Sequence, residues 1–198
     1  MTSHRQQPQS LEHSVELLER SLGYTRGRLA RARTTELTAQ TPCADWSLGE
    51  LLAHMDDALD AFLEASVGPV TPVGTRRTVS VAGVQDKACA LLGAWTAVTR
   101  GGTATIAVGD RQVPSGLLVA TAALEVAVHG WDVGRSTGEH APLPAALASA
   151  LQPVAATVVT DADREVRFAA ARPVRRGAPP DHVLLAHLGR SPGPSGQI

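Results

Sequence analysis

The stretch Pro-Ser-Gly-Leu-Leu-Val-Ala-Thr-Ala-Ala-Leu-Glu-Val-Ala-Val-His-Gly-Trp-Asp-Val-Gly-Arg occupies positions 114–135 of this 198-residue chain. From position 117 to 129, only Glu125 and His129 carry ionisable side chains. A helix that is apolar on all sides belongs in the interior of a protein, so we expect a core helix here. A buried carboxylate must be neutralised, hydrogen-bonded or bound to a cation. Because residues four apart share one helix face, Glu125 and His129 together supply two of the three ligands that a metal site needs.

The third ligand must come from elsewhere in the chain, and His54 is the candidate among the seven histidines. Ser47 and Glu50 form a capping-box pattern, which predicts a helix over 48–66. In that helix His54 lies beside the apolar stripe, on a side that carries only small residues: Ala58, Ala61 and Ala65. Small residues let a neighbouring helix approach closely, which would direct His54 into a cleft between helices. A surface histidine fits the same periodicity equally well.

Composition narrows the class of protein. The net charge is −1 and aromatic residues make up 3% of the chain, which argues against binding to nucleic acid or to an anionic membrane. The N-terminus has no apolar leader segment, and no apolar run of membrane-spanning length is expected. The two cysteines, Cys43 and Cys89, do not suggest a disulfide framework. We therefore expect a soluble cytoplasmic monomer or homodimer that acts on a small molecule.

Apolar periodicity predicts a mainly α fold. Four long helices are expected, which in an antiparallel arrangement make a four-helix bundle over residues 9–138. A small C-terminal α/β extension over 139–190 is expected to pack on the bundle, and 191–198 to be disordered. The expected helices cover 11–33, 48–66, 81–98, 114–138, 143–159 and 181–188, with a short strand or extended loop at 103–108 and an extended segment at 166–170.

Three blocks of sequence resemble a known family. They are Thr-Pro-Cys-Ala-Asp-Trp-Ser at 41–47 followed by Leu-Leu-Ala-His at 51–54, Val-His-Gly-Trp-Asp-Val-Gly-Arg-Ser-Thr-Gly at 128–138, and Leu-Leu-Ala-His-Leu-Gly-Arg-Ser-Pro at 184–192. They resemble actinobacterial metal-binding proteins of the DinB/YfiT-like superfamily, related to mycothiol-dependent maleylpyruvate isomerase. The resemblance implies a DinB-like four-helix bundle that holds a divalent metal through His54, Glu125 and His129. The chain is shorter than the isomerase with its full C-terminal domain, and residues 68–80 match no motif of the family.

Two imidazoles and one carboxylate suit Zn²⁺, with Ni²⁺ or Fe²⁺ as alternatives. Three protein ligands leave a coordination position open for water or substrate. The family resemblance implies mycothiol as co-substrate, which would make the chain a metal-dependent thiol S-transferase or isomerase acting on a small electrophile. Two alternatives share the same metal site: a metal-binding accessory protein without turnover, and a metal-hydroxide hydrolase or lyase that needs no thiol.

Other residues have two readings each. Glu125 and His129 could bond to each other without a metal, and Asp132 could orient a ligand histidine or pair with Arg135 on the surface. Trp46 and Trp131 could line a pocket or pack in the core. Cys43 could be a nucleophile or a small residue packed near Trp46. Three arginines could hold a substrate carboxylate or be solvated: Arg76, Arg77 and Arg111.

Overall fold

The computed structural model of this chain describes residues 10–33, 36–43, 46–68, 80–164 and 168–192. These residues form six α-helices and one β-hairpin, so the mainly α fold expected from the sequence is confirmed. The elements are α1 (Leu11–Leu29), α2 (Leu48–Val67), α3 (Val81–Gly101), β1 (Thr105–Val108), β2 (Arg111–Pro114), α4 (Ser115–Ser136), α5 (Ala145–Val158) and α6 (Pro180–His187). A 3-10 turn at Asp161–Asp163 follows α5.

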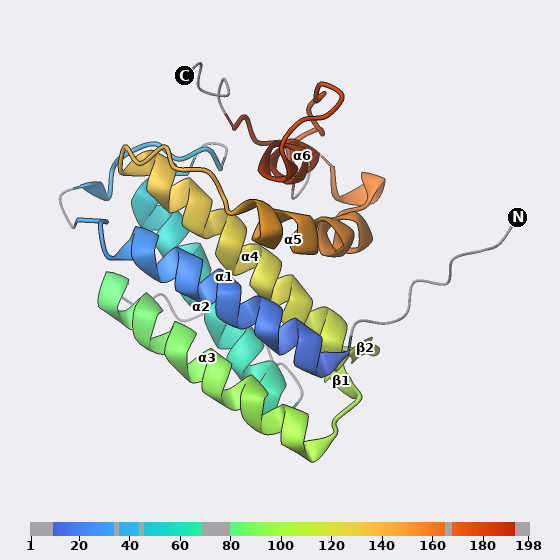
Figure 1. The fold of residues 1–198 in the computed structure, drawn as a ribbon. Helices are drawn as coiled ribbons and strands as arrows, with labels where there is room; N and C mark the ends of the chain where they lie inside the picture. The colour runs from blue at the N-terminus through green and yellow to red at the C-terminus, as the bar shows by residue number, and fades with distance from the viewer. Residues whose placement is uncertain (1–9, 34–35, 44–45, 69–79, 165–167, 193–198) are drawn as a thin grey trace, which may run out of the picture.

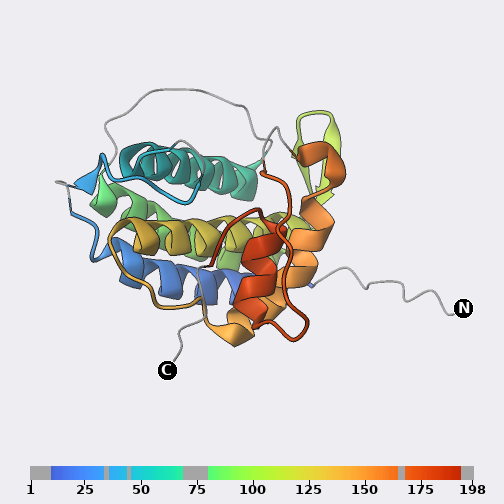
Figure 2. The same ribbon diagram turned by 90° about the horizontal axis from the view of Figure 1, so that it is seen from above.

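Helices α1 to α4 form the bundle, and α1 lies along α4 with the most extensive contact of any two elements (Figure 1). Helix α5 packs on α4, and α6 packs on α5, which places the C-terminal segment over one side of the bundle (Figure 2). The described part of the extension contains these helices, the 3-10 turn and an isolated bridge between Arg164 and Phe168. The division into a bundle over 9–138 and an extension over 139–190 packed on it stays a prediction, and positions 166, 167 and 193–198 lie outside the described residues.

The helices do not alternate in direction, so the expectation of a simple antiparallel bundle is wrong in its connectivity. Along α2 and α3, Lys87 contacts Asp56 and Asp60, and Trp95 Nε1 donates a hydrogen bond to the Phe62 carbonyl, so both helices run the same way. Helices α1 and α4 also run parallel to each other (Figure 1). A 20-residue helix is about 30 Å long, whereas the segment 68–80 can reach roughly 45 Å when extended. The connection is therefore long enough to return to the end where α2 began.

The start of α2 follows the sequence closely. Ser47 Oγ accepts from the Glu50 amide at 3.3 Å, and a Glu50 carboxylate oxygen accepts from the Ser47 amide at 2.8 Å, so the expected capping box is present. This pair fixes where the helix begins and thereby the face on which His54 lies.

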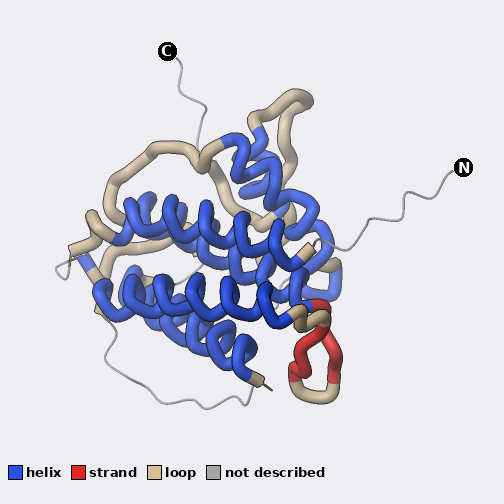
Figure 3. The backbone as a smooth tube through the Cα atoms, turned by 60° about the horizontal axis from the view of Figure 1, so that its bottom comes forward, coloured by secondary structure: helices blue, strands red, loops and turns tan. Residues whose placement is uncertain are grey.

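The small sheet lies between α3 and α4 rather than in the C-terminal extension. Strands β1 and β2 pair antiparallel, with Thr105 opposite Pro114 and Val108 opposite Arg111. The turn between them contains Gly109 at φ 59°, a left-handed conformation that favours glycine. The sequence predicts a short strand or an extended loop at 103–108 and no second strand, because Arg111–Pro114 is short, mostly exposed and ends in proline. The hairpin projects from one end of the bundle (Figure 3).

Helix α4 is the core of the molecule, as its apolar sequence predicted. By length and composition it could cross a membrane, so the expectation that no segment reaches that length is wrong. In the structure 78% of the most apolar 18-residue stretch of this helix is buried, chiefly by α1, α2 and α5. The same composition is typical of a buried core helix, which is the role that α4 has in this fold.

The contact between α1 and α4 is closest at Gly130. A Cβ atom added there would lie 2.2 Å from Thr25 Oγ1 and 2.9 Å from Thr25 Cβ. Thr25 cannot turn away freely, because it is 2% exposed and its hydroxyl donates a 2.7 Å hydrogen bond to the Val126 carbonyl. The absence of a side chain at Gly130 thus sets the spacing of the two helices and, with it, the position of His129.

We expect Gly130→Ala to lower the free energy of unfolding by about 1–3 kcal/mol, because the added methyl group forces the helices apart. Gly93→Ala is the matched control, since a Cβ at Gly93 in α3 meets nothing within 4 Å. That variant should be stabilised by up to about 1 kcal/mol through helix propensity alone. Urea denaturation of both variants measures the difference, and equal stabilisation of the two would contradict the close contact.

Candidate metal centre

Three side chains from two helices converge on one point, as the family resemblance implied. His129 Nε2 lies 3.0 Å from a Glu125 carboxylate oxygen, and His54 Nε2 lies 3.9 Å from the same oxygen. The ring centroids of His54 and His129 are 5.0 Å apart, with the rings nearly perpendicular. One potential ligand atom from each residue falls within 4.8 Å of the other two. His54 comes from α2 and the other two from α4, so the packing of these helices builds the cluster.

The contact of α2 with α4 is confirmed, but its expected details are only partly right. Ala58 and Val126 line the same small void next to Glu125 and His129. Ala61, also expected at this interface, is exposed instead.

Asp132 holds the ring of His129 from behind. Its side chain is fully buried, and one carboxylate oxygen accepts from His129 Nδ1 at 3.0 Å. Because Nδ1 is engaged by Asp132, Nε2 is the atom that faces Glu125 and His54. Of the two readings of Asp132, orientation of the histidine agrees with the structure, and the surface pair with Arg135 is wrong. Arg135 lies over the Trp131 ring and beside His140.

Arg190 completes this arrangement and was not singled out from the sequence. Its Nη2 donates to Asp132 at 2.7 Å, and its Nε donates at 3.0 and 3.2 Å to the two carboxylate oxygens. Arg190 is 7% exposed and lies beyond α6, 58 residues from Asp132. Its only sequence signal was membership of the C-terminal block at 184–192, because no local spacing links it to α4.

Four ionisable groups at the centre hold one another in their charged forms: Glu125, His129, Asp132 and Arg190. Burial works against the Glu125 carboxylate, but its close contact with His129 and the nearby His54 imidazole hold its pKa well below its usual range. Burial also opposes the His129 imidazolium, but hydrogen bonds with Asp132 and Glu125 raise its pKa to about 9. The same carboxylate oxygen and Nε2 atoms that form this ion pair are the atoms a metal would use, so the metal-free pair and a metal-bound state are alternative states of one site.

This balance predicts how the stability of the chelator-treated protein depends on pH. His129 has a pKa of about 9 in the folded state and about 6.5 when unfolded. The raised pKa of His129 means that its protonation stabilises the folded state. This contribution is fully present below about pH 6.5 and is lost as the pH rises through about 9. We expect a loss of up to about 3 kcal/mol across this window. Urea denaturation at several pH values, in the presence of EDTA, measures it. His129→Gln should remove this pH dependence, and an identical slope in the variant would contradict the assignment.

A cavity of about 510 Å³ opens beside the cluster. Its polar lining consists of His54, Glu125, His129, Thr121 and Arg190. The other described residues that line it are apolar: Trp46, Leu124, Val128, Val158, Phe168 and Leu188. The Trp46 ring lies 4.8 Å from the His54 ring, so Trp46 is part of the site. Trp131 is 3% exposed and is absent from the lining, in agreement with core packing.

Cys43 lies next to the site without lining the cavity. Its sulfur, a ring nitrogen of His129 and a carboxylate oxygen of Asp132 fall within 4.8 Å of one another. Burial raises the pKa of its thiol, which disfavours the nucleophilic thiolate. The Trp46 amide donates to its carbonyl, in agreement with a small residue packed near Trp46. Arg76 and Arg77 lie outside the described residues, and Arg111 is exposed on β2, away from the cavity lining.

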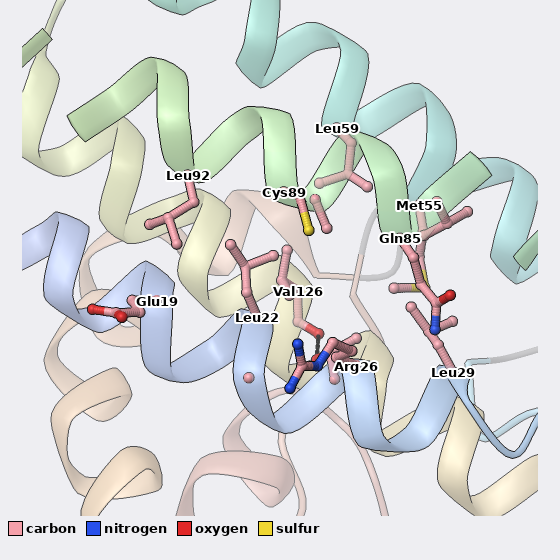
Figure 4. Close-up of a pocket in the computed structure, with 14 residues that line it drawn as sticks. Glu19, Leu22, Arg26, Leu29, Met55, Leu59, Gln85, Cys89, Leu92 and Val126 are labelled. Atoms are coloured by element: carbon pink, nitrogen blue, oxygen red, sulfur yellow. Dashed lines mark hydrogen bonds between the residues drawn. The ribbon is translucent and has the colours of Figure 1, made fainter. Parts of the chain in front are cut away.

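A second cavity of about 280 Å³ lies between α1 and α3, with Met55, Leu59 and Val126 toward the bundle interior (Figure 4). Helix α1 contributes Glu19 and Arg26 to its lining, and α3 contributes Gln85 and Cys89. Among the residues that the structure describes, none of its lining residues belongs to a cluster of potential metal ligands. The chemistry-bearing residues are therefore those of the larger cavity.

Comparison with known proteins identifies the family of this chain. The family model of the mycothiol maleylpyruvate isomerase N-terminal domain matches residues 18–134, more than half of the chain. Two uncharacterized proteins of Mycobacterium tuberculosis, MT0763 and Rv0738, are each 27% identical over 165 residues, covering 82% of this chain and 90% of theirs.

Among solved structures, the mycothiol-dependent maleylpyruvate isomerase is similar with a TM-score of 0.50 and 16% identity, over 68% of this chain. A mutant of that enzyme, with alanine in place of one histidine, gives 0.50 and 19%. At these identities the likeness concerns the fold. The chain matches 64% of the isomerase's length, less than two thirds of it.

Proposed function

Because the chain belongs to the mycothiol maleylpyruvate isomerase N-terminal domain family, we propose that it is an enzyme that uses mycothiol in an isomerase- or transferase-type reaction on a small molecule. The observation that carries the proposal is the cavity of about 510 Å³ beside His54, Glu125 and His129. Binding sites are typically concave and mostly apolar with a few convergent polar groups, and this cavity has that character.

We further propose that these three side chains hold a divalent metal, with Zn²⁺ preferred and Ni²⁺ or Fe²⁺ as alternatives. The fit rests on the donor set, two imidazoles and one carboxylate, and on the single oxygen of Glu125 that faces both Nε2 atoms. When bound, such a metal supplies Lewis acidity that lowers the pKa of a thiol and makes it nucleophilic at neutral pH.

The protein's own contribution is orientation and exclusion of water. Asp132 accepts a hydrogen bond from His129 Nδ1 and so keeps Nε2 directed at the site, while Arg190 keeps Asp132 ionised. The pKa of Asp132 is held below its usual range because the nearby Arg190 outweighs burial of the carboxylate. Trp46 and the aliphatic walls limit access of water, which suppresses competing attack of water on the electrophile.

The experiment that tests this proposal is titration of the cobalt-loaded protein with mycothiol. A new absorption band of the sulfur-to-metal type is expected, together with turnover that stays high below the pKa of the free thiol. S-methyl mycothiol is the control, since it cannot form a thiolate and should leave the spectrum unchanged. Conversion of a substrate without any spectral response to mycothiol would instead support a metal-hydroxide hydrolase or lyase. Binding without turnover of any electrophile would support an accessory role.

A further inference from the structure

The second cavity, of about 280 Å³ between α1 and α3, has an apolar interior. Its floor consists of Met55 and Leu59 from α2 and Val126 from α4, which are buried residues of the core. The apolar residues of its walls come from α1 and α3: Leu22, Leu29, Val84, Ala88 and Leu92. The volume is close to the lower end of the range of small-molecule sites, about 300–1,000 Å³. A small hydrocarbon body would gain contacts with this lining.

Packing of the two helices does not explain why this space stays open. Gly23 of α1 lines the cavity, yet a Cβ atom added there would meet nothing within 4 Å. The φ of Gly23 is not positive, so the backbone does not require glycine at this position either. Glycine inside a helix is less favourable than a residue with a side chain. The cavity is therefore kept open at a cost to α1, which favours a binding site over a packing defect.

The charges in the described lining are arranged asymmetrically along α1. Its anion, Glu19, and its cation, Arg26, are both exposed and lie about 10 Å apart along the helix axis. Glu19 is the first α1 residue of the lining, whereas Arg26 lies between the lining residues Leu22 and Leu29. Figure 4 shows Glu19 near one end of the cavity, with Arg26 and Cys89 nearer its middle on facing helices. The cation, not the anion, thus adjoins the central apolar part.

We propose that this cavity binds a small amphiphilic carboxylate, with the carboxylate at Arg26 and the hydrocarbon body against Met55, Leu59 and Val126. A guanidinium pairs with a carboxylate through two parallel hydrogen bonds, and burial of the hydrocarbon adds affinity without demanding a precise fit. This site is separate from the proposed reaction, because the cavity does not include His54, Glu125 or His129.

The test needs a readout confined to this cavity. Met55, Leu59 and Val126 also line the small void beside Glu125 and His129, so only one layer of side chains separates the two regions. A calorimetric signal could come from either region. Cys89 resolves this ambiguity, because it lines the second cavity and its exposed thiol is accessible to alkylating reagents.

Iodoacetamide labelling at pH 8 is therefore followed by mass spectrometry at Cys89, with N-acetylcysteine in the same mixture as a reference thiol. The probes are octanoate, octan-1-ol and octyltrimethylammonium, each below its critical micelle concentration. Octanoate should slow the labelling of Cys89 in a saturable way and at lower concentrations than the other two probes. An unchanged labelling rate with octanoate would overturn the proposal. Stronger protection by the alcohol or by the cation would overturn the role of Arg26.

One variant tests the charge. Arg26→Gln should weaken octanoate binding about fivefold, the upper range for an exposed charge pair, and leave octan-1-ol binding unchanged. Arg20→Gln, at an exposed position of α1 outside the described lining, is the matched control and should change neither affinity. Equal octanoate affinity in the two variants would contradict the pairing with Arg26.

A second variant tests the place of binding. Ala88→Leu adds a larger side chain to the cavity wall and should abolish protection by both octanoate and octan-1-ol. Ala90→Leu makes the same change on the other side of Cys89, at an exposed position outside the described lining, and should retain protection. Each labelling rate is compared with that of the same variant without a probe, so a direct effect on the thiol cancels. Full protection in folded Ala88→Leu protein would place the binding site elsewhere and overturn the proposal.

Discussion

His129→Ala should leave the purified protein with almost no bound zinc, whereas the unaltered chain should hold about one ion. The variant loses one of three ligands and also the hydrogen-bond partner of the buried Asp132 carboxylate. Loss of an outer-shell partner alone typically costs 10–100-fold in metal affinity, so loss of a ligand should cost at least about 100-fold. Elemental analysis after dialysis against a weak chelator measures the stoichiometry, and competition with a chromophoric chelator measures the affinity.

The control for this experiment is His13→Ala, which removes a largely exposed histidine of α1 and should leave the metal content unchanged. His54→Ala and Glu125→Gln should each behave like His129→Ala, because the three side chains act at one point. Glu125→Gln is the more demanding variant, since it keeps the shape of the side chain and removes only its charge. Full occupancy in any of these three variants would mean that the metal ligands lie elsewhere or that the cluster is a metal-free ion pair.

The local features of this molecule were predictable from the sequence because they depend on short spacings. The i, i+4 relation of Glu125 and His129 and the capping box at Ser47 act within one or two turns of helix. Periodicity placed His54 beside a face of small residues but left a surface position equally open. The family resemblance added the assignment of all three residues to one site, and the structure brings them together.

The features that were missed depend on contacts far apart in the chain. Periodicity gives the face that a helix buries, but it does not give the direction in which the next helix runs. The parallel course of α2 and α3 therefore had to come from the structure. Arg190 is a stronger case, because its partner Asp132 lies 58 residues away and a single arginine in a C-terminal segment has no distinguishing pattern. The second strand of the hairpin, Arg111–Pro114, is too short and too polar to be predicted from the sequence.

Replacing Arg190 by methionine is expected to lower the free energy of unfolding by about 3–5 kcal/mol. The substitution keeps most of the side-chain volume but leaves the fully buried Asp132 carboxylate without its cation, and an uncompensated buried charge has a cost of this size. The same variant should bind zinc about 10–100-fold more weakly, because Asp132 no longer holds the His129 ring as firmly. Arg175→Met, at an exposed loop position, is the matched control and should stay within about 0.5 kcal/mol of the unaltered chain.

A double variant separates the two effects of Arg190. Asp132→Asn combined with Arg190→Met removes both charges, so the free energy of unfolding should recover by a large part of the loss seen in Arg190→Met alone. Zinc affinity should not recover, since the asparagine amide is a poorer partner for His129 Nδ1 than a carboxylate. Urea denaturation of metal-free protein and chelator competition of the loaded protein measure the two quantities separately. If stability and zinc affinity recovered together, Arg190 would act on the metal site only through the stability of the fold, and its role in holding the orientation of His129 would be disproved.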